Sequence, residues 1–292
     1  MWKYTALKRA VSDGRSHQHI PNSSRKIMRQ MVHINSRGLR GREHSLSKPE
    51  GVYRILFLGD SITFGFGVKE EDIFVNVLER ELNSQFASLP DQKRFELINA
   101  GIGNYNTKQE FAYLREEGFR YEPDEVVVMF YINDLEPTQK FANNWFTRNS
   151  FFYALIVSQL RRVFQIYFLH MNYESYYKNL YNERSIGEFN SLVRRMADFT
   201  GRHHFKLKAV LVPELHDLRH YSLGSEYEQV KSIFIQRRIP VLDLRLFFDS
   251  SIPSSEYWVA RDDAHPNVRA HQVIAKAISE VFYNATTKIP VQ

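Results

Sequence analysis

The stretch Arg54-Ile55-Leu56-Phe57-Leu58-Gly59-Asp60-Ser61-Ile62-Thr63 decides how this chain folds. Its first half is apolar apart from Arg54 and predicts a buried strand, and the Gly-Asp-Ser that follows predicts a tight turn at the strand's end. Parallel sheets form their sites beyond the carboxyl ends of the strands. We therefore expect Ser61 at the edge of a sheet where reacting groups gather.

The rest of the chain repeats this pattern of a short apolar run followed by polar residues. Four further runs predict strands of the same, mostly parallel sheet: Phe95–Asn99, Glu125–Tyr131, Leu207–Val212 and Val241–Leu244. Apolar residues at helical spacing predict helices over 72–86, 186–199 and 268–283. Strands that alternate with helices favour an α/β fold, a three-layer α/β/α sandwich around a five-stranded sheet with right-handed crossovers.

Polar residues that suit catalysis follow the predicted strands. Asn104 comes after the second strand, Asn133-Asp134 after the third, and His265 after the fifth. Because the carboxyl ends of parallel strands share one edge, we expect these side chains to meet Ser61 there.

A serine, a histidine and a carboxylate are the groups that nucleophilic acyl transfer requires. The Ser61 hydroxyl attacks an ester only when a base removes its proton, and His265 is the candidate base. Asp262, three residues before His265, is expected to orient the imidazole and stabilise its cationic form. Asp263 is the alternative carboxylate.

The negative charge that develops on the acyl oxygen also needs hydrogen-bond donors. Asn133 offers its side-chain amide, and the backbone N–H groups of Ser61 and of the loop 101–104 could complete an oxyanion hole. The loss of one such donor typically lowers turnover by about 10²–10³.

Four segments resemble the conserved blocks of the SGNH hydrolases, also called GDSL esterases and lipases. They are Gly59-Asp60-Ser61-Ile62, the stretch 99–107, Tyr131-Ile132-Asn133-Asp134, and Asp262-Asp263-Ala264-His265-Pro266-Asn267. The resemblance covers roughly residues 50–285 and implies a flavodoxin-like sheet, with Ser61, Asp262 and His265 as the triad and Ser61, Asn104 and Asn133 as the oxyanion hole.

Three positions depart from the family pattern. Ile62 stands where leucine is usual, Tyr131 replaces a glycine, and Asn104 replaces the glycine whose N–H lines the oxyanion hole, with Gly103 as the alternative by one position. A backbone donor survives the change at Asn104, because Asn tolerates a left-handed backbone better than most residues. The stretch 33–41 resembles a lead-in found in membrane-associated bacterial members of the family.

The net charge of +6 is concentrated at the start of the chain. Residues 1–45 hold ten Lys/Arg and two acidic residues, which leaves 29 basic and 31 acidic residues for the remainder. We expect residues 1–50 to be a basic arm that packs on the domain as irregular chain with one or two short strands. Residues 51–292 then form the catalytic domain, with an aromatic helical cap inserted at about 135–185. The arm is a candidate contact for an anionic membrane surface or a polyanionic glycan; no nucleic acid partner is expected.

These observations predict a serine esterase that hydrolyses short O-acyl esters, with carbohydrate acetyl groups among the candidate substrates, and that needs no organic cofactor or metal. The alternatives are a glycan O-acyltransferase with the same triad, a lipase or acylhydrolase at a membrane surface, and a non-catalytic polyanion-binding module. The absence of cysteine excludes disulfides, a thiol nucleophile and Cys-ligated metals. No signal peptide or membrane span is recognised, so a cytoplasmic location is the default expectation, and an extracytoplasmic one would need an upstream anchor.

Overall fold

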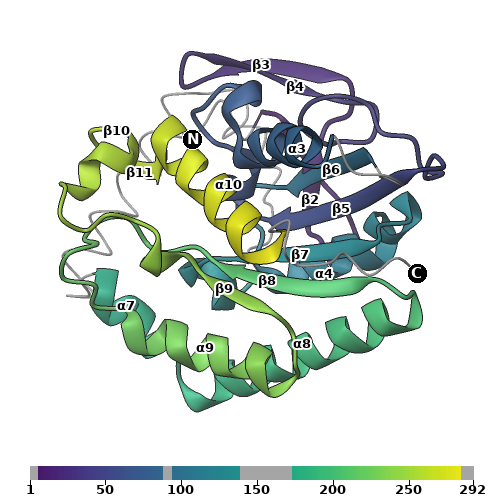
Figure 1. The fold of residues 1–292 in the computed structure, drawn as a ribbon. Helices are drawn as coiled ribbons and strands as arrows, with labels where there is room; N and C mark the ends of the chain where they lie inside the picture. Colours follow the sequence, from purple (N-terminus) through teal and green to yellow (C-terminus); the bar gives the residue numbers. More distant parts are fainter. Residues whose placement is uncertain (1–5, 88–93, 139–172, 284–292) are drawn as a thin grey trace.

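A computed structural model describes residues 6–87, 94–138 and 173–283. Its centre is a five-stranded, wholly parallel sheet in the order β6-β5-β7-β8-β9 (Figure 1). The strands are β5 (Val52–Gly59), β6 (Arg94–Gly101), β7 (Glu125–Phe130), β8 (Lys206–Leu211) and β9 (Val241–Asp243). All five predicted strands are therefore confirmed, and the first strand lies inside the sheet as the flavodoxin-like fold requires.

Helices cover both faces of the sheet and make it the middle layer of three. One face packs against α4 (Thr107–Glu116), α8 (Glu183–Arg202) and α9 (Gly224–Gln236), and the other against α3 (Phe74–Gln85) and α10 (Val268–Phe282). Alternate residues of β5 serve the two cores: Leu56 and Leu58 face the first, and Ile55 and Phe57 the second. Figure 1 shows α8 and α9 on one side of the sheet and α3 and α10 on the other.

The remaining elements are short. They are α2 (Ser61–Phe64), α7 (Tyr173–Leu180), the strands β10 (Trp258–Ala260) and β11 (Asp263–Pro266), and the 3₁₀ turns η1 (Glu70–Asp72), η2 (Gly118–Tyr121), η3 (Ile132–Leu135), η4 (Leu244–Leu246) and η5 (Ser254–Tyr257). Most of the predicted cap, 139–172, lies outside the described residues. Its final part forms α7 and the start of α8, where Tyr177 and Tyr181 enter the core.

The N-terminal segment is more regular than its sequence suggests. It forms two hairpins, β1 (Lys8–Ala10) with β2 (His17–His19) and β3 (Ser23–Ile27) with β4 (Gln30–Ile34), rather than one or two short strands. Apolar side chains of these hairpins pack against Phe64 and Phe66, next to the turn after β5 that carries the candidate nucleophile Ser61. The segment therefore contacts the rest of the chain close to the carboxyl edge of the sheet, where Ser61 lies.

Candidate active site

The turn after β5 presents Ser61 at the carboxyl edge of the sheet. Asp60 caps α2, because its carboxylate accepts a hydrogen bond from the Ile62 N–H at 2.8 Å. Ser61 is the first residue of that helix, a position whose N–H has no intrahelical acceptor. Only glycine fits just before the turn, because a Cβ on Gly59 would lie 2.0 Å from the Thr63 hydroxyl. The chain thus exposes both a hydroxyl and an amide hydrogen at Ser61.

His265 reaches this serine from a distant part of the sequence. Its Nε2 lies 2.9 Å from Ser61 Oγ although 204 residues separate the two. His265 sits on β11, which pairs with β10 in a hairpin just before α10. The Phe66 ring packs against the imidazole with centroids 4.9 Å apart. The hydroxyl and the imidazole are therefore within direct proton-transfer reach.

The carboxylate partner of His265 is Asp263, not Asp262. The Asp263 Oδ1 lies 2.5 Å from His265 Nδ1, whereas Asp262 is exposed in the turn between β10 and β11. Side chains two apart on a strand share one face, so Asp263 and His265 project together from β11. The expectation for Asp262 is wrong for this reason, since it assumed a loop rather than a strand. Burial would raise the pKa of the Asp263 carboxyl, but its hydrogen bonds with His265 outweigh this effect and lower that pKa.

A hydrogen bond to Asp60 holds the Asn133 side chain beside the turn that carries Ser61. Its Nδ2 donates to Asp60 Oδ2 at 3.1 Å, and no described residue satisfies its buried Oδ1. An amide nitrogen carries two hydrogens, so one remains for a ligand. Burial raises the pKa of Asp60 although Ile62 and Asn133 donate to it. The Asp60 side chain thus holds both the serine helix and the candidate oxyanion donor.

Asn104 lies in the loop after β6, beside the nucleophile turn. Gly101 pairs with Gly59 in the sheet, so the two loops leave adjacent strands at the same level. Asn104 has a left-handed backbone with φ of 65°, and its exposed side chain accepts a hydrogen bond from Lys8 Nζ at 3.0 Å. A backbone conformation that normally favours glycine is therefore kept at the position where glycine was expected.

Buried carboxyl groups lie under this edge. Asp134 Oδ2 accepts the Tyr131 N–H at 3.0 Å, while neither oxygen of the buried Glu110 has a partner among the described residues. Burial raises the pKa of both Asp134 and Glu110 well above the ordinary range. These two carboxyls favour the neutral form and leave Asp263 as the ionised partner of the imidazole.

The family model described as GDSL-like lipase/acylhydrolase matches residues 57–226, more than half of the chain. The chain belongs to this family. This GDSL protein is accordingly a hydrolase that acts on ester bonds. No curated protein sequence matches it significantly.

Solved structures of several esterases share the fold of this GDSL protein. An acetyl xylan esterase, AlAXEase, is 14% identical with a TM-score of 0.50, over 78% of this chain and 99% of that one. A catalytic mutant of Axe2, an acetylxylan esterase from Geobacillus stearothermophilus, is 17% identical with a TM-score of 0.50, over 78% and 93%. TesA is 14% identical with a TM-score of 0.50, over 78% and 96%. At these identities the likeness establishes the common fold.

Three residues of the GDSL site were not assigned a role from the sequence. A capping role for Asp60 could have been read from the preference of helix starts for aspartate. Phe66 and Lys8 gave no such signal, because Phe66 belongs to no recognised motif and Lys8 lies 95 residues before the loop that it contacts.

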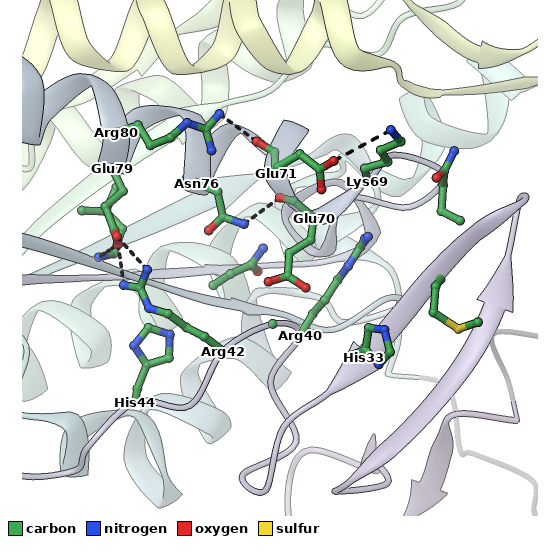
Figure 2. Close-up of a pocket in the computed structure, with 15 residues that line it drawn as sticks. His33, Arg40, Arg42, His44, Lys69, Glu70, Glu71, Asn76, Glu79 and Arg80 are labelled. Carbon is green, nitrogen blue, oxygen red and sulfur yellow. Dashed lines mark hydrogen bonds and ion pairs between the residues drawn. The ribbon is translucent and has the colours of Figure 1, made fainter.

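A separate cavity of about 620 Å³ lies between β4, α3 and the segment 40–44. Figure 2 shows ion pairs among its lining side chains, Arg42 with Glu79 at 2.7 Å and Lys69 with the nearby Glu71 at 3.8 Å. Arg40, in its wall, donates to the carbonyl oxygens at the end of α2. Arg40 therefore connects the lining of this cavity to the C-terminal end of α2.

Nowhere in 6–87, 94–138 or 173–283 do three His, Asp or Glu side chains gather in a way that could hold a metal ion. Within the same ranges, no helix combines the length and the apolar character that a bilayer span requires.

Proposed function

We propose that this protein is a serine esterase that cleaves short-chain O-acyl esters, with O-acetylated carbohydrate as the preferred substrate class. Ser61 is the nucleophile, His265 the general base and acid, and Asp263 the residue that orients the imidazole. The observation that carries the proposal is the continuous set of contacts from Ser61 Oγ to His265 at 2.9 Å and from His265 to Asp263 at 2.5 Å.

The reaction follows from these contacts in two halves. His265 Nε2 takes the Ser61 proton while Oγ attacks the ester carbonyl, and a tetrahedral oxyanion forms. The imidazolium then gives its proton to the departing alcohol oxygen, and the acyl group stays on Ser61. Water attacks the acyl-enzyme with His265 again as base; the imidazolium then returns the proton to Ser61 Oγ as the acyl–Oγ bond breaks, and the carboxylic acid leaves. Asp263 keeps the Nδ1–H tautomer and stabilises the imidazolium in both halves.

The donors for the oxyanion come from three different loops. They are the Ser61 N–H at the start of α2, the Asn133 amide hydrogen that Asp60 does not occupy, and the Asn104 N–H. Each belongs to a loop that leaves the sheet at the same edge, and Asn133 is fixed by its hydrogen bond to Asp60 at 3.1 Å. Donors held in place before reaction need no reorganisation when charge develops.

The substrate class is supported by the structural neighbours. Two of them are acetyl xylan esterases, and another, 18% identical with a TM-score of 0.50 over 78% of this chain and 48% of that one, is a two-domain esterase active on acetylated mannans. Phe66, which packs on the imidazole of His265 and is itself buried, places an apolar ring next to the proposed general base.

The test is an acyl-length series of p-nitrophenyl esters run beside acetylated xylan and mannan. We expect the highest kcat/KM on the acetyl ester and release of acetate from at least one polysaccharide. The Ser61→Ala variant should lose turnover, while the control Ser232→Ala, at an exposed serine on α9, should keep it. A maximum at long acyl chains would replace the proposal by a lipase, and transfer of acetyl to added sugar in preference to water would replace it by an acyltransferase.

We also propose that the basic N-terminal segment meets an anionic lipid surface through the β3–β4 hairpin. Arg25, Lys26 and Arg29 are exposed there, together with Met28 at 37% and Met31 at 54% exposure. The turn has positive φ at Met28 (47°) and Arg29 (69°), where Asn-Gly is usual, so its long side chains are held at the tip against backbone preference. Basic and apolar side chains on one tip suit an anionic bilayer better than a glycan.

Vesicle co-sedimentation tests this contact. Vesicles that contain phosphatidylglycerol should bind the wild type in a salt-sensitive way, and the triple reversal Arg25→Glu, Lys26→Glu, Arg29→Glu should abolish binding. The matched reversal of the exposed Arg194, Arg195 and Arg202 on α8 should not. Equal loss in both triples, or binding to a polyanionic glycan but not to vesicles, would refute the lipid contact.

A further inference from the structure

Side chains of the N-terminal hairpin β1–β2 form hydrogen bonds with the loop that follows β6. The buried Lys8 donates from its ammonium to the Gly103 carbonyl and, at 3.0 Å, to the Asn104 carboxamide oxygen. His17 Nε2 lies 3.0 Å from the same Gly103 carbonyl. Two side chains from the start of the chain thus converge on one peptide of the candidate oxyanion loop.

Side chains from the loop after β6 and from α4 in turn donate hydrogen bonds to backbone carbonyls of the hairpin. The Tyr105 hydroxyl donates to the His17 carbonyl at 2.5 Å, and Gln109 Nε2, at the start of α4, donates to the Arg15 carbonyl at 2.7 Å. The hairpin and the loop therefore hold each other through hydrogen bonds in both directions. A displacement of one requires a displacement of the other.

We propose that Lys8 is a positioning residue of the oxyanion hole, which fixes the Gly103–Asn104 peptide so that the Asn104 N–H faces the reacting carbonyl. This proposal rests on the proposed esterase function. Lys8 touches neither the substrate nor the reacting atoms in this role, and it acts only through the loop.

The argument depends on the geometry of the peptide bond. A trans peptide is planar, and its C=O and N–H point in opposite directions. When Lys8 and His17 hold the Gly103 oxygen on the side of the hairpin, the Asn104 N–H must point away from the hairpin. The same ammonium binds the Asn104 side chain, so it also stabilises the left-handed φ of 65° on which that orientation depends.

The charge of Lys8 is sensitive to pH. Burial lowers the pKa of Lys8 to about 7, and the carboxylate of Asp60 in the nucleophile turn opposes this shift. His17 and His19 on β2 also face Lys8; burial and its charge lower the pKa of each to about 3, so both are neutral at the working pH. Arg40, which acts on His19, is the other charged neighbour. Loss of the Lys8 proton weakens both of its hydrogen bonds, because charge-assisted bonds are stronger than neutral ones.

The first experiment compares Lys8→Met with Arg9→Met, in which the exposed neighbour on the same strand loses an equal charge. On p-nitrophenyl acetate we expect Lys8→Met to lower kcat about 10- to 100-fold, somewhat less than the loss of a whole donor. KM should change less than about threefold, because the loop acts on the transition state. The fold should persist, since His17 still binds the Gly103 carbonyl.

The pH profile provides a readout that a merely structural role would not change. Wild-type kcat should fall as pH rises through about 7, and this alkaline decline should be absent from Lys8→Met. Either a kcat within twofold of wild type or an unchanged alkaline decline in Lys8→Met overturns the proposal.

A chemical rescue covers the case in which Lys8→Met does not fold. The chain has no cysteine, so Lys8→Cys carries the single thiol of the molecule. Aminoethylation in denaturant followed by refolding restores an amine on a side chain of the same length. The alkylated protein should recover kcat to within about threefold of wild type, and the unalkylated protein should not. Equal kcat in the two forms refutes the role of Lys8, whereas absence of turnover in the wild type itself refutes the esterase proposal instead.

Discussion

The replacement Asp263→Asn distinguishes the two adjacent aspartates before His265. Asparagine keeps the shape of the side chain but removes the charge that stabilises the imidazolium. It can also donate to Nδ1 and so favour the tautomer in which Nε2 carries the proton and cannot accept one from Ser61. Asp262→Asn is the matched control. It removes the same charge from the preceding residue, which lies in an exposed turn.

The expected magnitude follows from the contact between the two side chains. At 2.5 Å between Asp263 Oδ1 and His265 Nδ1, Coulomb's law with an effective dielectric constant of about 20 gives roughly 6–7 kcal/mol. The two side chains keep 26% and 27% of their surface exposed, so water screens part of this energy. We therefore expect a loss of about 3–5 kcal/mol in transition-state stabilisation, a fall in kcat of about 10²–10⁴.

The assay is steady-state hydrolysis of p-nitrophenyl acetate, with circular dichroism to establish that both variants fold. Asp262→Asn should retain kcat within about twofold of wild type, because surface substitutions away from a site have small effects. A larger loss in Asp262→Asn than in Asp263→Asn would refute the assignment of Asp263 and restore the original expectation from the sequence.

Three further changes probe the oxyanion hole, the nucleophile turn and the core. Asn133→Ala should lower kcat by about 10²–10³ with little change in KM; a change confined to KM would instead make Asn133 a substrate-binding residue. Gly101→Ala should destabilise the protein by about 1–3 kcal/mol, because a Cβ there would lie 2.2 Å from the Phe64 nitrogen. Its control Gly187→Ala, in α8 with open space around it, should stabilise by up to about 1 kcal/mol in denaturant titrations. Burial lowers the pKa of His271 to about 3. As pH falls below the unfolded value of about 6.5, only the unfolded chain gains this proton, so native stability is lost. The free energy of unfolding of His271→Leu, measured relative to that of wild type, should therefore rise by about 2 kcal/mol when pH falls from 7.5 to 5. A difference that does not change with pH would contradict the burial of a neutral imidazole.

The central sheet could be predicted from the sequence because its strands are short, apolar and bounded by turn residues. Two helices could not. On α4 the polar Gln109 and Glu110 are buried, and on α9 Glu226 is buried while Ile235 is 56% exposed, so neither shows a clean apolar stripe. For the N-terminal segment the sequence predicted only one or two short strands instead of two hairpins, because β1 and β2 have three residues each and β3 is largely polar.

The candidate site was predictable as far as it depends on topology. Ser61, Asn104 and Asn133 follow strands of the parallel sheet, which places them along one edge, whereas His265 reaches Ser61 from the separate β10–β11 hairpin rather than from a loop directly after the fifth strand. The role of Asp263 depends on a detail finer than topology, since a change from loop to strand moves the partner of His265 by one residue. Lys8 depends on tertiary contacts that leave no mark on local sequence.

The most direct test of the esterase mechanism is to identify the residue that a fluorophosphonate modifies. The wild type should carry one adduct on the peptide that contains Ser61, Ser61→Ala should carry none, and Asp263→Asn should be labelled far more slowly than Asp262→Asn. An adduct on another residue, or full labelling of a folded Ser61→Ala variant, would contradict the account.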